Sequence, residues 1–263
     1  MSAIALITGA SSGLGREFVR QVDNGAGGHI DEIWVVARRA DRLESLVRTC
    51  KTPVRPFCLD LEDDTSFEIL EAAFAEERAM NDLATIRLLV NNAGAGTFGA
   101  FARQDKTAAP QMMNVLMRAP VELIYRALPY MAPGSRIINV ASVAAFLPQP
   151  KLAVYAAAKR FILDLSRALN AELDGTGIRV TALCPKFMRT EFLNIPGDAG
   201  TAECMGAAIG FERVQDVAAA ALKAAAAGKD LCIPSLDMKL LYAATRVAPY
   251  RVVLAVERAL GVI

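Results

Sequence analysis

Short apolar runs alternate with longer amphipathic segments along most of the chain. Such runs are typical of buried strands, whereas apolar residues three and four positions apart are typical of helices. Strands are predicted at 3–8, 33–37, 54–59, 86–90, 136–141, 178–184 and 231–233. Helices are predicted at 16–22, 41–50, 65–80, 110–131 and 215–227, and in a segment that contains Tyr155 and ends near residue 173. This alternation predicts an α/β fold with a doubly wound parallel sheet, and no linker divides it into separate domains.

The composition favours a well-buried core and excludes several classes of protein. Hydrophobic residues make up 54% of the 263 residues, and the mean hydropathy is +0.31. A net charge of +1 gives no bulk attraction to nucleic acid. Five scattered cysteines and a single histidine disfavour a zinc site or a disulfide framework. With no basic leader and no apolar run long enough to span a membrane, the sequence predicts a cytoplasmic protein.

A glycine-rich turn joins the first predicted strand to the first predicted helix. It reads Gly9-Ala-Ser-Ser-Gly13-Leu-Gly15. A strand, a glycine turn and a helix together present backbone N–H groups and a helix N-terminus to a phosphate. The spacing differs from the commonest dinucleotide fingerprint, and a tight turn without a ligand is the alternative. Its position directly after the first strand favours cofactor binding.

Two arginines follow the second predicted strand. In a nucleotide-binding sheet, the end of this strand faces the adenosine ribose. An acidic residue there would accept from a 2′-hydroxyl, whereas arginine would pair with a 2′-phosphate. Arg38 and Arg39 therefore favour NADP(H) over NAD(H), with Arg38 as the stronger candidate. A pair of surface arginines at the start of the next helix is the alternative.

Tyr155 and Lys159 are four residues apart in an Ala-rich helical segment, so they lie one turn apart on one face. An ammonium beside a phenol favours the phenolate and lowers its pKa from about 10. Such a tyrosine could exchange a proton with a carbonyl or alcohol oxygen near neutral pH. Ser142 follows the predicted strand 136–141 and could hydrogen-bond the same oxygen. A helical tyrosine beside a surface lysine is the alternative.

Together these residues resemble the short-chain dehydrogenase/reductase family along nearly the whole chain. The family's order and approximate spacing are matched by TGASSGLG at 8–15, NNAG at 91–94, Asn114, Ser142 and Tyr155-x-x-x-Lys159. The resemblance implies a Rossmann-type sheet of about seven strands. It also implies an oxidoreductase that interconverts a ketone or aldehyde and an alcohol, and a homodimer or homotetramer. A non-catalytic NADP-binding regulator on the same fold is the alternative.

The resemblance assigns the catalytic roles residue by residue. Tyr155 would be the acid/base, and Ser142 would orient the substrate oxygen. Lys159 would hold the nicotinamide ribose and lower the pKa of the tyrosine. Asn114 would anchor a water that links Lys159 to solvent as a proton relay.

The resemblance also assigns a set of cofactor-binding residues, to which Tyr155 and Lys159 belong. The others are Gly9, Ser11, Ser12, Gly13, Leu14 and Gly15 at the pyrophosphate, Arg38 at the 2′-phosphate, Asp60 at the adenine, Asn92, Ala93 and Gly94 along the adenosine ribose, and Pro185 and Thr190 near the carboxamide. One departure concerns Lys186, because the family usually has glycine after this proline. The lysine could alter the nicotinamide end of the site, or reach an anionic substrate.

The remaining predictions concern two segments near the C-terminus and the substrate. Weak periodicity at about 190–210 predicts a lid over the substrate. The apolar and basic extension 238–263 could pack on its own domain or a dimer partner, form a wall of the substrate pocket, or contact an anionic membrane peripherally. An apolar substrate (steroid-like, acyl or aromatic) is indicated by apolar residues near the strand ends. These are Phe98, Phe101, Phe146, Leu147, Phe187, Met188, Phe192, Leu193 and Met205.

Overall fold

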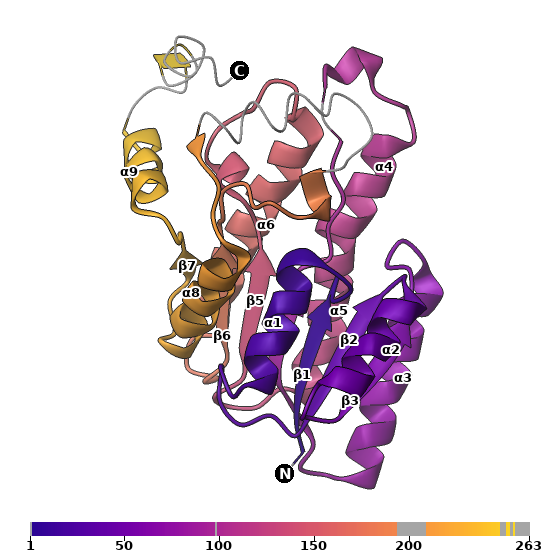
Figure 1. Cartoon of the computed structure of the whole chain (residues 1–263). Coiled ribbons are helices and arrows are strands. Elements are labelled where there is room, and N and C mark those ends of the chain that lie inside the picture. Colours follow the sequence, from indigo (N-terminus) through magenta and orange to yellow (C-terminus); the bar gives the residue numbers. More distant parts are fainter. Residues whose placement is uncertain (1, 98, 194–208, 248–250, 253–254, 256–263) are drawn as a thin grey trace.

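A seven-stranded parallel sheet forms the centre of the molecule (Figure 1). The computed structural model describes residues 2–97, 99–193, 209–247, 251, 252 and 255. Within these ranges the strand order is β3-β2-β1-β4-β5-β6-β7. The strands are β1 (Ala3–Thr8), β2 (Glu32–Ala37), β3 (Val54–Cys58), β4 (Thr85–Asn91), β5 (Arg136–Val140), β6 (Arg179–Leu183) and β7 (Leu231–Cys232). The predicted Rossmann-type, doubly wound sheet is confirmed.

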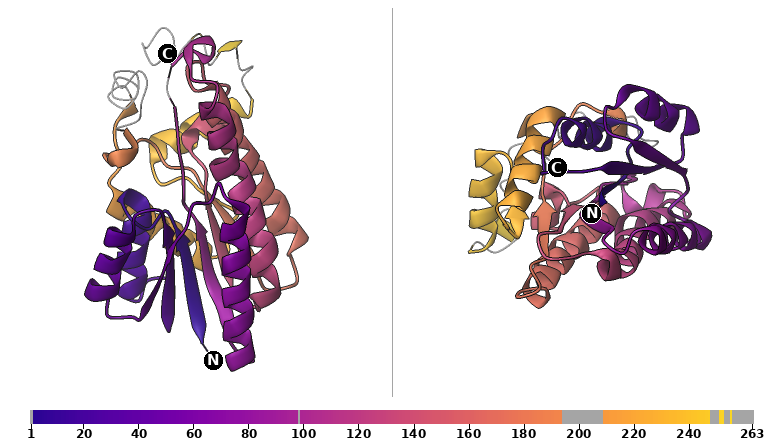
Figure 2. Two further views of the ribbon diagram at one scale, coloured as in Figure 1. Left: turned by 90° about the vertical axis from the view of Figure 1, so that its right-hand side faces the viewer. Right: turned by 90° about the horizontal axis from the view of Figure 1, so that it is seen from below.

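Helices cover both faces of the sheet (Figure 2). One face carries α1 (Gly13–Asp23), α2 (Ala40–Thr49) and α8 (Val214–Ala226), and the other carries α3 (Asp64–Met80), α5 (Ala119–Ala127) and α6 (Ala153–Glu172). Two further helices are α4 (Ala108–Met113), which leads into α5, and α9 (Leu236–Thr245), which packs near α6. Because both faces are covered, the strands read as nearly continuous apolar runs rather than as alternating ones.

The long helix predicted at 110–131 contains an irregularity that the sequence analysis did not foresee. Residues Asn114–Arg118 form a π-helical segment between α4 and α5. Pro120 follows two residues later. A proline lacks the N–H that a regular helix needs, and its ring clashes with the carbonyl four residues earlier. The wider turn before Pro120 lets the helical path continue through this obstacle.

A buried polar chain ties two central strands to α6. Asn91 donates to the side chain of Asn139 (2.8 Å), and Asn139 donates to the Ser166 hydroxyl (3.0 Å). Ser166 in turn donates to the carbonyl of Ile162 (2.6 Å). These contacts hold the helix that carries Tyr155 against the carboxyl ends of the strands, where parallel α/β sheets bind ligands.

Two kinds of feature are absent from the described ranges. No helix there is long and apolar enough to cross a membrane. The same residues contain no cluster of three or more His, Cys, Asp or Glu side chains arranged to hold a metal ion.

Candidate active site

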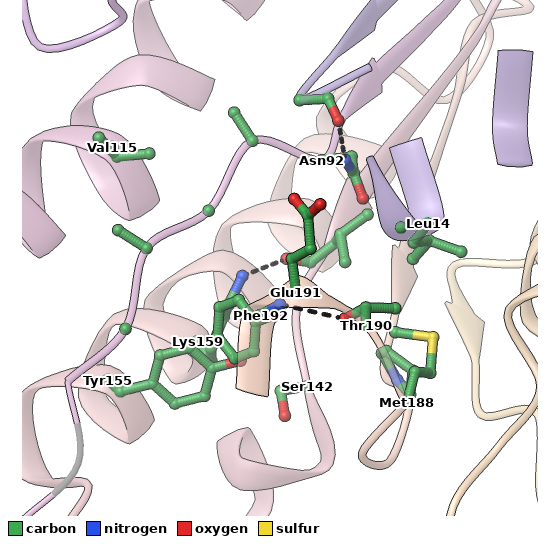
Figure 3. A pocket seen from close by; sticks show the side chains of 18 of the residues that line it. Leu14, Asn92, Val115, Ser142, Tyr155, Lys159, Met188, Thr190, Glu191 and Phe192 are labelled. Atoms are coloured by element: carbon green, nitrogen blue, oxygen red, sulfur yellow. Dashed lines mark hydrogen bonds between the residues drawn. The ribbon is translucent and has the colours of Figure 1, made fainter. Parts of the chain in front are cut away.

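A cavity of about 600 Å³ opens at the carboxyl edge of the sheet (Figure 3). Its walls come from the loops after the six strands β1 to β6 and from α6 and α9. Of the predicted site residues, Gly15 and Asn114 do not line this cavity. Those that do are Gly9, Ser11, Ser12, Gly13, Leu14, Arg38, Asp60, Asn92, Ala93, Gly94, Ser142, Tyr155, Lys159, Pro185 and Thr190. The structure thus brings together nearly all of the residues that the sequence analysis selected.

The glycine-rich turn is packed too closely for side chains. Gly9 has φ +66°, and a Cβ on Gly9 would lie 2.9 Å from the Cα of Ala93. A Cβ on Gly15 would lie only 2.2 Å from the carbonyl oxygen of Gly9, so Gly15 has a packing role behind the cavity wall. The Ser12 side chain makes no capping hydrogen bond, and the first turn of α1 carries no acidic residue. The N-terminus of α1 therefore suits a phosphate group.

Thr8 is a buried anchor that the sequence analysis did not identify. Its hydroxyl accepts from the backbone N–H groups of Asn92 (3.0 Å) and Ala93 (2.9 Å). The Asn92 side chain donates to the Thr8 carbonyl (3.0 Å), so the two segments bind each other reciprocally. These contacts fix the position of the 91–94 turn beside the glycine-rich turn. The only sequence signal was that Thr8 begins the TGASSGLG motif.

Arg39, rather than Arg38, contacts the glycine-rich turn. Its guanidinium donates to the hydroxyls of Ser11 (2.8 Å) and Ser12 (2.9 Å). Arg38 is 69% exposed, and its nearest anionic partner is Asp60, 3.7 Å away. Both arginines line the cavity, and the ranking of Arg38 above Arg39 for a 2′-phosphate stays a prediction. The sequence did not show which of two adjacent side chains folds back over the turn.

The three predicted catalytic side chains converge on one end of the cavity (Figure 3). Tyr155 and Lys159 lie one turn apart on α6, with the ammonium 5.7 Å from the centroid of the phenol ring. Lys159 donates to the carbonyl of Val140 at the end of β5 (2.7 Å). Ser142 follows this strand and accepts from the backbone N–H of Ala144 (3.1 Å), which caps the short helical turn Val143–Phe146.

Burial dominates the electrostatics of this group. It raises the pKa of Tyr155 to about 12, and the hydrogen bond with Ser142 acts in the opposite direction. Burial also lowers the pKa of Lys159 to about 8. Burial therefore outweighs the predicted lowering of the tyrosine pKa. Removing a phenol from water disfavours its charged form more than its neighbours here favour it.

Lys186 is engaged by the protein itself. Its ammonium pairs with Asp237 on α9 (2.7 Å) and donates to the carbonyl of Ile209 (3.0 Å). Its backbone N–H donates to the carboxylate of Glu212 (2.8 Å). The ammonium thus has an anionic partner within the protein, and the alternative that this lysine reaches an anionic substrate stays a prediction.

Apolar side chains form the remainder of the wall, with some differences from the predicted set. Phe187, Met188, Phe192 and Leu193 line the cavity as expected. Phe98, Met205 and residues 194–208 of the predicted lid lie outside the described residues. The other differences are that Phe101 is exposed, that Phe146 and Leu147 belong to the core, and that Leu152, Ile209, Met238 and Leu241 are additional wall residues. Since Met238 and Leu241 belong to α9, the described start of the C-terminal extension contributes to the pocket wall.

Sequence comparison identifies the family. The family model for short chain dehydrogenase matches residues 3–196. The chain belongs to the short-chain dehydrogenase family. The sulfoacetaldehyde reductase of Chromohalobacter salexigens is 32% identical to this short-chain dehydrogenase over 198 residues, or 73% of this chain and 75% of that protein.

Solved structures of short-chain dehydrogenases share the same architecture. One from Sphingobium yanoikuyae, in complex with NADPH, is 27% identical, with a TM-score of 0.77 over 94% of this chain and 92% of that chain. The bulky-bulky ketone specific alcohol dehydrogenase of Comamonas testosteroni is also 27% identical, with a TM-score of 0.72 and the same coverage. A family member from Burkholderia phymatum, in complex with NAD, has a TM-score of 0.79 over 92% of each chain, but at 21% identity this likeness shows the fold alone.

Proposed function

We propose that this short-chain dehydrogenase interconverts an apolar ketone or aldehyde and the corresponding alcohol with NADP(H). The proposal rests mainly on one observation: Tyr155, Ser142 and Lys159 line the same cavity as the glycine-rich turn. A proton-transfer group and a phosphate-binding turn in one cavity are what a nicotinamide-dependent oxidoreductase requires.

The residues present fit a dinucleotide with a 2′-phosphate. The turn at Gly9 and the uncapped N-terminus of α1 would hold the pyrophosphate. Arg38 and Arg39 line the cavity at the end of β2, where the adenosine ribose and its 2′-phosphate would lie. Asp60 would face the adenine, and the NADPH complex of the Sphingobium relative supports this cofactor. When bound, NADP(H) would supply or accept the hydride.

The protein's own side chains would transfer the proton. A phenol with a pKa of about 12 stays protonated at neutral pH, so Tyr155 is prepared to donate to a carbonyl oxygen. Ser142 would hold that oxygen through its hydroxyl. Lys159, with a pKa of about 8, is mostly charged at pH 7 and would stabilise the tyrosinate that forms during reduction. The water relay at Asn114 stays a prediction.

The wall favours an apolar substrate. Phe187, Phe192, Leu193 and Leu241 line the cavity, and the ammonium of Lys186 is already paired with Asp237. The Comamonas relative acts on bulky-bulky ketones, which agrees with this wall. The sulfoacetaldehyde reductase, by contrast, shows that related chains also serve small anionic aldehydes. The substrate panel should therefore include both kinds.

Tyr155→Phe tests the proposed mechanism. It should lower the turnover of NADPH with apolar ketones by about 100-fold or more, because it removes the proton donor alone. NADPH affinity, measured by fluorescence titration, should change by less than about twofold, because the ring stays in place. Tyr125→Phe is the matched control, since Tyr125 is 71% exposed on α5 and should leave turnover unchanged.

The alternative function, a non-catalytic NADP-binding regulator, gives a different result in the same experiment. Such a protein would bind NADPH and turn over no ketone, aldehyde or quinone between pH 6 and pH 9. Near-normal turnover in Tyr155→Phe would instead exclude the proposed role of Tyr155.

Arg39→Ala tests the choice of cofactor. It should weaken NADPH binding by about 10- to 100-fold, or roughly 1.5–3 kcal/mol, if a charge-assisted pair with the 2′-phosphate is lost. NADH, which lacks that phosphate, should bind almost as before. Arg48→Ala on the exposed side of α2 is the control. Equal losses for NADPH and NADH would contradict the assignment.

A further inference from the structure

One carboxylate of the protein lies among the arginines at the adenosine end of the cavity. Each oxygen of Glu191 pairs with a different guanidinium, that of Arg39 (2.7 Å) and that of Arg42 (2.7 Å). Glu191 lines the cavity and lies far from both arginines in the sequence. It follows β6, whereas Arg39 precedes α2 and Arg42 lies in the first turn of α2. Two guanidinium groups that each bind one oxygen of an anion form an arrangement that also suits a phosphate.

The surroundings of Glu191 form an anion site that the carboxylate fills. Arg39 uses its remaining N–H groups to hold the hydroxyls of Ser11 and Ser12 on the glycine-rich turn. The two arginines hold the pKa of Glu191 down at about 2, so this carboxylate is charged throughout the physiological range. A dianionic phosphate would interact with the same two guanidiniums more strongly than a single carboxylate does.

The carboxylate is also linked to the catalytic end of the cavity by its neighbours in the chain. Thr190 lies against the glycine-rich turn, because a Cβ on Gly13 would be 3.2 Å from the Thr190 side chain. The Phe192 ring packs against Tyr155, with 5.8 Å between the centroids (Figure 3). The pairing of Glu191 with the arginines therefore helps to hold the short helical turn Glu191–Leu193 over the cavity.

We infer that Glu191 is a built-in competitor for the 2′-phosphate and determines how strongly the enzyme prefers NADP(H). The inference rests on the proposed NADP(H) dependence. Binding of NADP(H) must displace the Glu191 carboxylate from Arg39 and Arg42, which releases the turn Glu191–Leu193 and with it the Phe192 ring. A cofactor without the 2′-phosphate leaves the carboxylate in place.

Glu191→Gln separates the two cofactors in an equilibrium measurement. By removing the competing charge, it should tighten NADPH binding by roughly five- to twentyfold. The fragment 2′,5′-ADP should gain by a similar factor, whereas NADH and 5′-AMP should stay within about twofold of the wild type. Dissociation constants come from calorimetry or cofactor fluorescence, without substrate and without turnover.

Two further variants keep the experiment decisive. Glu191→Ala removes the carboxylate without leaving an amide and should shift NADPH affinity in the same direction. Glu76→Gln is the matched control, because Glu76 pairs with Arg55 (2.9 Å) far from the cavity and should change neither affinity.

The outcomes distinguish this inference from the proposed function. Unchanged or weaker NADPH binding in both Glu191 variants, in a protein that prefers NADPH, would overturn the inference alone. Equal tightening of NADPH and NADH would overturn it too, because the effect would not involve the 2′-phosphate. A wild type without any preference for NADPH would overturn the proposed cofactor and the inference together.

Discussion

At the scale of single residues, burial affects the pKa values of Tyr155 and Lys159 more than neighbouring charges do. Lys159 is nearly enclosed by protein, and its main polar contact is the carbonyl of Val140. The desolvated ammonium is less stable than it would be in water, as is the phenolate of Tyr155. Burial therefore shifts the pKa of both groups toward their neutral forms, although Lys159, with a pKa of about 8, stays mostly charged at pH 7.

Lys159→Met makes this desolvation measurable. The folded pKa of Lys159 is about 8 against 10.5 in the unfolded chain, so the unfolded state binds more protons between these values. The free energy of unfolding therefore rises with pH across this window. The wild type should gain up to about 3 kcal/mol relative to Lys159→Met between pH 7.5 and pH 10.5.

This gain must be read as a difference between the two proteins in denaturant titrations. Burial raises the pKa values of Tyr155 and Cys184 to about 12 each, so these groups destabilise both proteins as the pH rises above about 9. A difference that stays flat across the window would mean that Lys159 is hydrated in the folded state.

Residues in sequence motifs could be predicted, whereas residues that act through distant partners could not. Ser142, Tyr155 and Lys159 were found because their spacing and position after a strand carry a chemical meaning of their own. Glu191 and Thr8 have no such local signal. Glu191 meets Arg39 across 152 positions of sequence, and Thr8 meets Asn92 across 84. Only the folded chain brings these pairs together.

At the scale of elements, Lys186 connects three segments around the substrate end of the cavity. It follows β6, bonds the carbonyl of Ile209 before α8, and pairs with Asp237 on α9. The packed side of α9 contributes Met238 and Leu241 to the wall. The residue that departs from the usual family pattern is thus the one that attaches α9 to the site.

Lys186→Met should loosen this wall. We expect KM for an apolar ketone to rise by roughly five- to tenfold. Without the partly buried ion pair and the hydrogen bond, the wall would be held less firmly, and the free energy of substrate binding would weaken by about 1–1.5 kcal/mol. Asp237→Asn should reproduce the effect, and the double variant should cost less than the sum of the two. NADPH affinity should stay within about twofold in all three.

The matched control for this prediction is Lys223→Met on the exposed side of α8, which should leave KM unchanged. Additive effects of Lys186→Met and Asp237→Asn would show that the two residues act independently. That result would remove the assigned role of the pair.

Helix boundaries and irregularities were less predictable than the existence of the helices. The C-terminal helix begins at Leu236, slightly before the predicted extension, because Ser235 and Asp237 are compatible with a helix start. The π-helical segment at Asn114–Arg118 was not predicted, since the spacing of apolar residues did not mark it.

At the scale of the whole molecule, the fold could be predicted because every strand carries its own signal. A strand buried on both faces reads as an uninterrupted apolar run, and a parallel neighbour requires a crossover helix between such runs. All seven strands were located by this pattern, with ends that agree to within one residue. The homodimer or homotetramer and the cytoplasmic location stay predictions, because they depend on surfaces and on cellular sorting.

The helical path through Asn114 places two apolar side chains behind the Tyr155 phenol. In a helix, one added residue rotates everything beyond it by about 100° about the axis. Met112, before the bulge, and Leu116, within it, both pack in the cluster that includes Ala158 and the Tyr155 ring. Because these two positions are four residues apart, their side chains share a face, and the added residue turns only the part of the helix beyond the bulge. The side chains that support the Tyr155 ring from behind therefore keep their common face at the irregular segment.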